Sequence, residues 1–246
     1  MMIHDDITLA IEAANPSMPE ASVALGFGDE VRAFEPIAPA TREADHLVAA
    51  VARACASSGV APGRINRVAV SVGPGGYTAV RMAVAAGKLI AEAAWSRRPS
   101  SHGASRAACV AVPSALSVAH AVRSLLPPGP FAVVLACKGE TGYVAEFAPD
   151  LSPGPVRVRR AREIETLNPR PVALVLDPAV GGAFAPAAAG IGALVVPARC
   201  DARSCLAAAR GLPIVDPLEL LPIYAREPEA VSLWRARRAP GPPGAP

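Results

Sequence analysis

Apolar positions along the chain recur with two different periods. Short apolar or alternating runs predict strands at residues 7–11, 21–25, 67–72, 109–112, 131–137, 142–147, 172–176 and 193–196. Apolar residues at helical spacing predict helices at residues 45–57, 78–95 and 113–126. The turn-rich segment Asn15-Pro16-Ser17 separates the first two strands and predicts an opening hairpin. Strands and helices alternate in two successive sets, which predicts an α/β protein of two lobes.

A polar, irregular stretch at residues 96–107 interrupts this pattern and predicts a linker or a surface insertion. We therefore expect an N-terminal α/β lobe at residues 1–107 and a C-terminal α/β lobe at residues 108–230. Residues 231–246 are basic and rich in proline and glycine, a composition typical of a disordered tail.

The glycine-rich segment after the third predicted strand is the sharpest local feature. Gly73, Gly75 and Gly76 precede a predicted helix for which Thr78 is the expected N-cap. Glycines permit close backbone approach and a helix N-terminus attracts anions, so the segment is either a tight structural turn or a phosphate cradle. Its spacing matches neither a Walker A loop nor a dinucleotide-binding fingerprint.

Small residues recur every four positions along the helix that follows: Ala79, Ala83, Gly87 and Ala91. Such a smooth ridge lets another element approach the helix closely. The neighbour is either part of the same chain or a helix of a partner, and the pattern alone leaves both open.

Six segments resemble, in the same order, the motifs of one known family. They are residues 7–25, 42–47, 71–93, 110–116, 137–143 and 222–226. The strongest is SVGPGGYTAVRMAVAAGKLIAEA at residues 71–93, which looks like a strand, a GPGSFTG-type turn and a helix. The last, Pro222-Ile223-Tyr224-Ala225-Arg226, matches a closing P-x-Y-x-R. On these motifs the chain resembles the TsaB (YeaZ) family.

The resemblance implies a two-lobed, actin-like and Hsp70-like fold of the ASKHA, RNase H-like class. It also implies a non-catalytic role as the dimerisation partner of a TsaD homologue, the threonylcarbamoyltransferase. With the ATPase TsaE, this complex modifies the adenosine next to the anticodon of tRNA. No cofactor of its own is implied for this chain, because ATP and metal are expected on the TsaD partner. The tRNA would be met through the complex, and the same helices would allow a homodimer in isolation.

In that family, the helix after the glycine turn and the helix before it build the partner-binding face. Here they correspond to residues 78–95 and 45–57. The expected partner-binding residues are Leu47, Val48, Val51, Ala79, Val80, Ala83, Gly87 and Ala91.

The chain departs from the family pattern beside the first strand. Glu12-Ala13-Ala14 stands where the family has an acid followed by two hydroxyl residues, and Ala79 replaces a glycine. These losses weaken any nucleotide or metal site there. The expected remnant of such a site is Glu12, Gly73, Gly75, Gly76 and Thr78.

Composition and charge narrow the function further. The net charge of +3, from 24 basic and 21 acidic residues, gives no electrostatic case for autonomous nucleic-acid binding. The five cysteines show no disulfide or metal-ligand spacing, which favours reduced thiols and a cytoplasmic location. No signal-like N-terminus and no long apolar run is present in the sequence, so we expect no membrane association.

A few polar residues are weaker candidates for a metal site or for phosphate contacts. Glu12 and Asp177 each follow an apolar strand and either form part of a metal site or cap turns. No pair of histidines has metal-ligand spacing, and no nucleophile motif is present. Arginine clusters at residues 157–162 and 235–238 are either phosphate contacts or solvated faces.

The alternative to a partner subunit is an autonomous enzyme of the same fold, either an ATP-dependent kinase or a glycoprotease-like metallopeptidase.

Overall fold

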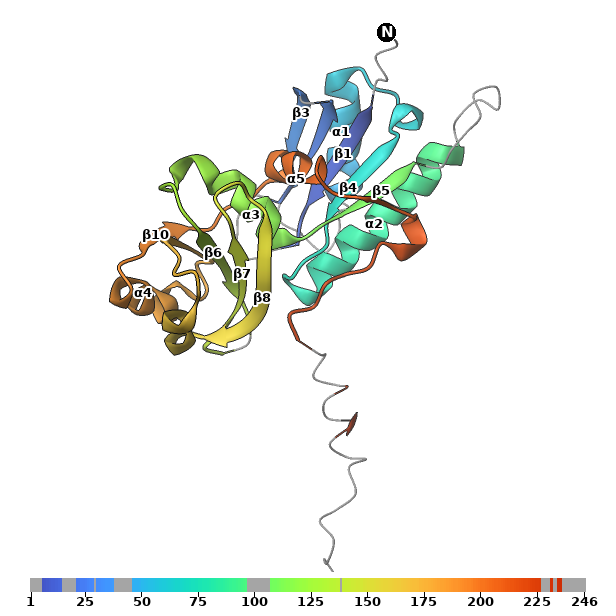
Figure 1. Cartoon of the computed structure of the whole chain (residues 1–246). Coiled ribbons are helices and arrows are strands. Elements are labelled where there is room, and N and C mark those ends of the chain that lie inside the picture. The colour runs from blue at the N-terminus through green and yellow to red at the C-terminus, as the bar shows by residue number, and fades with distance from the viewer. Residues whose placement is uncertain are drawn as a thin grey trace, which may run out of the picture.

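The computed structural model describes residues 6–14, 21–28, 30–37, 46–96, 107–137, 139–226, 231 and 234–235. Figure 1 shows two lobes side by side, each built around a twisted sheet. No helix in the described ranges is long and apolar enough to cross a membrane.

The first sheet has six strands in the order β11-β5-β4-β1-β2-β3. They are β1 (Ile7–Glu12), β2 (Ser22–Phe27), β3 (Glu30–Pro36), β4 (Arg67–Ser71), β5 (Ala108–Val112) and β11 (Ile214–Val215). The central strand β1 is buried along its whole length, pairs antiparallel with β2 and pairs parallel with β4. Helices α1 (His46–Ser58) and α2 (Tyr77–Ser96) cover one face, and α5 (Ala202–Ala209) covers the other. The short helical turns η1 (Pro62–Arg64) and η5 (Pro217–Glu219) lie against α2.

The second sheet has five strands in the order β10-β9-β6-β7-β8. They are β6 (Phe131–Ala136), β7 (Thr141–Phe147), β8 (Pro153–Arg160), β9 (Ala173–Leu176) and β10 (Leu194–Pro197). Helix α3 (Ser114–Val122), continued by η3 (Arg123–Leu125), packs on one face. Helix α4 (Gly181–Gly190) and the turn η4 (Ala161–Thr166) pack on the other.

The mixed α/β class and the two-lobed organisation are as predicted. Three strands, β3, β8 and β11, were not predicted. Because β3 pairs with β2, the expected opening hairpin is a three-stranded meander. All three lie at sheet edges and are largely exposed. Strands β3 and β8 lack the apolar run that marks a buried strand, and β11 has only two residues. The alanine-rich helices α4 and α5 were also not predicted. The expected third helix ends early, at Val122, and continues as a 3₁₀ turn.

The division expected after residue 107 does not follow the sheets. Strand β5 pairs parallel with β4 and therefore belongs to the first sheet. After the second sheet is complete, the chain returns to the first one through α5 and β11. The expected linker lies outside the described residues except for its ends. The same holds for the expected tail, apart from residues 231, 234 and 235.

Candidate functional site

The glycine turn between β4 and α2 is filled by other parts of the chain. Gly73 has a φ of +99°, and a Cβ placed on it would lie 2.6 Å from the carbonyl oxygen of Ile223. A Cβ on Gly75 would collide with the carbonyl oxygen of Ala14. The same Ala14 oxygen accepts a hydrogen bond from the Gly76 amide at 2.8 Å. Because backbone from two distant segments occupies the turn, the geometry favours the structural interpretation over the phosphate cradle.

The C-terminal segment holds the beginning of α2 in place. Helix α2 starts at Tyr77, so Thr78 lies within the first turn and is not the N-cap that we expected. The rings of Tyr77 and Tyr224 stack with centroids 5.2 Å apart, and the guanidinium of Arg81 lies 5.2 Å from the Tyr77 ring centre. The Ile223 amide donates to the Val72 carbonyl at 2.7 Å. The matched P-x-Y-x-R segment at residues 222–226 is therefore fastened to the glycine turn.

Glu12 ends β1 as a buried carboxyl group, only 2% exposed. Its Oε1 accepts a hydrogen bond from the Ala14 amide at 3.2 Å, whereas Oε2 has no hydrogen-bond partner among the described residues. Burial raises the pKa of Glu12 to about 7. The Ser71 hydroxyl, the Ala14 amide and the Cys200 thiol offset part of that rise, and the charge of Asp201 adds to it. Glu12 is therefore largely protonated at slightly acidic pH.

Glu12 and the glycine turn, two parts of the expected remnant, are brought together. Ala14 links them, because its amide donates to Glu12 and its carbonyl accepts from Gly76. The Ser71 hydroxyl, which also interacts with Glu12, lies 2.9 Å from the Ser114 hydroxyl and joins β4 to the start of α3. Within the described ranges, no group of three or more His, Cys, Asp or Glu side chains gathers as metal ligands would. One buried carboxyl group is a poor donor set for a divalent cation.

Asp177, the second strand-end acid, lies in the other sheet. Its carboxylate oxygens accept from the Ala136 amide at 3.2 Å and from the Ala179 amide at 2.9 Å. The side chain thus fixes the ends of β6 and β9, which is the turn-capping role left open by the sequence.

A polar recess of about 420 Å³ lies beside Cys200, between α3 and α5. His120, Arg199 and Asp201 line it. Burial, together with the nearby charge of Arg210, lowers the pKa of His120. Asp201 is the N-cap of α5 and also pairs with the guanidinium of Arg203, so its charge is already satisfied within the chain.

The small-residue ridge of α2 faces its own sheet. Ala83 and Ala91 are each 1% exposed, and a Cβ on Gly87 would lie 2.5 Å from Val70 Cγ2 of β4. Val80 and Val51 are also buried in the first core. The expectation that these five residues contact a partner is wrong, because α1 and α2 use them to pack on the first sheet.

The other three expected partner-binding residues lie nearer the surface. Val48 is 53% exposed on α1, whereas Leu47 and Ala79 are half-buried. Of the eight, only Val48 offers a large apolar side chain to solvent.

The side of α2 opposite the small-residue ridge is an apolar surface that was not predicted from the sequence. We call it the α2 outer face, and it consists of Thr78, Met82, Ala85, Ala86, Leu89 and Ala93. Met82 is 60% exposed and Leu89 is 71% exposed. These positions repeat at helical spacing just as the ridge does, so the same periodicity that identified the ridge also contains this face.

Comparisons with known proteins agree with this architecture. Residues 34–96, which run from β3 through α1 and β4 to the end of α2, match the family model TsaD, tRNA N6-adenosine threonylcarbamoyltransferase. The structure of YeaZ from Pseudomonas aeruginosa superposes with a TM-score of 0.67 at 19% identity, covering 89% of this chain and 99% of that one. The chain has the YeaZ fold.

A second solved structure has the same YeaZ fold. It is described as an uncharacterized protein with similarity to peptidase YEAZ from Pseudomonas aeruginosa. Its TM-score is 0.63 at 20% identity, with 90% of this chain and all of that one covered. No curated protein matches the sequence. The fold and the match to the TsaD model together support the resemblance to the TsaB (YeaZ) family, including its actin-like, two-lobed architecture.

Proposed function

We propose that this chain is a non-catalytic partner subunit of a TsaD-type transferase in the complex that makes threonylcarbamoyladenosine in tRNA. The observation that carries the proposal is the position of the TsaD-family match. Residues 34–96 contain both α1 and α2, the two helices on one face of the first sheet. Two proteins that share this layer can pair through it in a nearly symmetric way, as homodimers do.

The α2 outer face is the part of that layer suited to docking. Leu89 and Met82 lie on one stripe, and the alanines between them leave the backbone open to close approach by another helix. Full burial of an exposed leucine or methionine side chain contributes roughly 1.5–3 kcal/mol. Arg81 and Glu92 flank the stripe and supply the polar rim typical of an interface.

The remaining parts of the proposal follow from this assembly. A TsaE homologue would join the pair, ATP and metal would be held by the TsaD partner, and tRNA would be met in the cytoplasm through the complex. In the absence of TsaD, the same α2 outer face would pair two copies of this chain.

The test is co-elution with a TsaD homologue from the same organism on size-exclusion chromatography. Met82→Glu and Leu89→Glu should each abolish the heterodimer while leaving the circular dichroism spectrum unchanged, because both side chains already face water. Leu125→Glu is the matched control, since Leu125 is 48% exposed on the other lobe and should not affect co-elution. Heterodimers that survive both α2 substitutions would refute this assignment.

One observation favours a second function. A similar structure is described by its similarity to a peptidase, which is compatible with an autonomous enzyme of this fold. That function requires the isolated chain to bind zinc or ATP. Isothermal titration calorimetry with each ligand decides the matter, and heat from a one-to-one site would favour the enzyme.

A further inference from the structure

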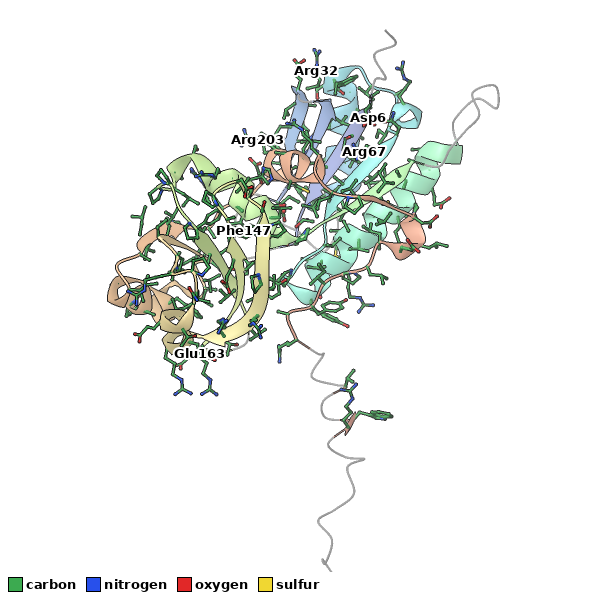
Figure 2. All side chains as sticks on the ribbon, viewed as in Figure 1. Asp6, Arg32, Arg67, Phe147, Glu163 and Arg203 are labelled. Atoms are coloured by element: carbon green, nitrogen blue, oxygen red, sulfur yellow. The ribbon has the colours of Figure 1, made fainter. Side chains whose placement is uncertain are left out.

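Four arginines gather on the free edge of the second sheet. Arg157, Arg159 and Arg160 lie on β8, and Arg162 follows in η4. Strand β8 ends the strand order and pairs only with β7, so its other edge has no neighbour in the described structure. Figure 2 shows nitrogen-tipped side chains projecting outward beside the labelled Glu163, at the end of this strand. We call these four residues the arginine edge.

The register of β8 sets the direction of the charges. Arg157 pairs with Val144 and Arg159 pairs with Gly142, and both of these partners lie on the α4 side of the sheet. Two residues along a strand span about 6.6 Å, so the two guanidinium groups leave the same face as neighbours. Arg160 leaves the opposite face. Positive groups thus surround the strand edge on both sides.

These arginines are not neutralised within the described part of the chain. None of their guanidinium groups pairs there with a carboxylate, and the Nε of Arg159 is shielded from solvent without a hydrogen-bond partner. Glu163 accepts a hydrogen bond from the Arg160 amide at 2.6 Å and so starts η4. By contrast, ion pairs to Asp or Glu are formed elsewhere by Arg32, Arg53, Arg67 and Arg203.

We propose that the arginine edge binds the phosphate backbone of RNA. A planar guanidinium donates two parallel hydrogen bonds to a phosphate, and a row of them along a strand can follow successive phosphates. No aromatic side chain lies among residues 153–166, so the contact would position the RNA without reading its bases. The whole chain carries a charge of only +3, and the local charge density is what makes this surface suitable.

The competing ligand for this edge is an acidic peptide that would add to the sheet as a sixth strand. Pro153 and Pro155 have no amide hydrogen, so two of the first three residues of β8 cannot donate to a further strand. This interruption favours contact through charge over extension of the sheet. The inference rests on the proposed function only for the identity of the RNA, which would be the tRNA substrate of the complex.

The test uses the full chain and a fluorescently labelled, unmodified tRNA transcript, with anisotropy measured over a series of potassium chloride concentrations. The variant is Arg157→Gln/Arg159→Gln/Arg162→Gln. The control is Arg32→Gln/Arg53→Gln/Arg64→Gln, which removes the same charge from the first lobe. We expect the arginine-edge variant to bind at least about ten-fold more weakly at low salt, with a salt slope reduced by about two to three. The control should stay within about two-fold of the wild type.

Equal losses in the two variants would overturn the proposal, because binding would then follow net charge alone. Polyglutamate that binds the wild type as tightly as the tRNA, and that depends on the same arginines, would also overturn it in favour of an acidic peptide. Failure of the RNA-binding proposal can be distinguished from failure of the proposed partner-subunit function. In RNA-free buffer the arginine-edge variant should still co-elute with the TsaD homologue, whereas the Leu89→Glu variant should still bind tRNA.

Discussion

The buried carboxyl group of Glu12 leads us to predict how the stability of the folded chain depends on pH. Glu12→Gln keeps the shape of the side chain and its hydrogen bond from the Ala14 amide, but removes the proton that titrates. Burial raises the pKa of Glu12 from 4.5 to about 7 in the folded protein. The folded chain therefore holds a proton, between pH 4.5 and 7, that the unfolded chain has already lost.

The sign and size of the effect follow from that difference. Stability contributed by the protonated carboxyl is fully present below pH 4.5 and is lost as the pH rises to about 7. The shift corresponds to about 3 kcal/mol of unfolding free energy, since Glu12 is almost fully buried. For a chain of this size, that amounts to roughly 6–12 °C in the melting temperature. Glu12→Gln should therefore be more stable than the wild type at pH 8, with the gain vanishing near pH 4.5.

The measurement is urea unfolding of both proteins, followed by circular dichroism at several pH values from 4.5 to 8. Glu219→Gln is the control, because it removes one carboxylate from the exposed surface and leaves the buried Glu12 in place. If the wild type and Glu12→Gln lose stability in parallel over this range, Glu12 is already ionised in the folded state. The account of an unsatisfied, desolvated carboxyl would then be refuted.

Two further predictions concern packing and capping. Gly87→Val should destabilise the chain by about 1–3 kcal/mol, because its Cβ would lie 2.5 Å from Val70 Cγ2, whereas Ala85→Val on the α2 outer face should change the melting temperature little. An unchanged melting temperature for Gly87→Val would contradict the inward orientation of the ridge. Asp201→Ala removes the acceptor for the Arg203 and Ser204 amides and should cost about 1–2 kcal/mol in chemical unfolding, whereas Asp201→Asn should retain most of that stability.

The buried strands were predictable because each carries a short apolar run that a sheet interior demands. The edge strands β3, β8 and β11 were not, because a largely exposed strand such as β8 needs no run of apolar residues. The edge strand β10 was predicted, because its residues are apolar although most of them are exposed. The environment of Glu12 could also not be predicted from the sequence. Its pKa depends on Ser71 and on Cys200, which local patterns do not bring together.

A single residue, Gly87, could have shown from the sequence which face of α2 is buried. Both faces of this helix carry small or apolar residues at the same period, so periodicity alone cannot say which face is buried. Glycine within a helix costs about 1 kcal/mol relative to alanine, and close packing against a neighbour can compensate for that cost. Gly87 therefore marks the face pressed against β4, where a Cβ would meet Val70. Leu89 lies on the far side of the helix, at 71% exposure, so it is the surface opposite Gly87 that remains available to a partner.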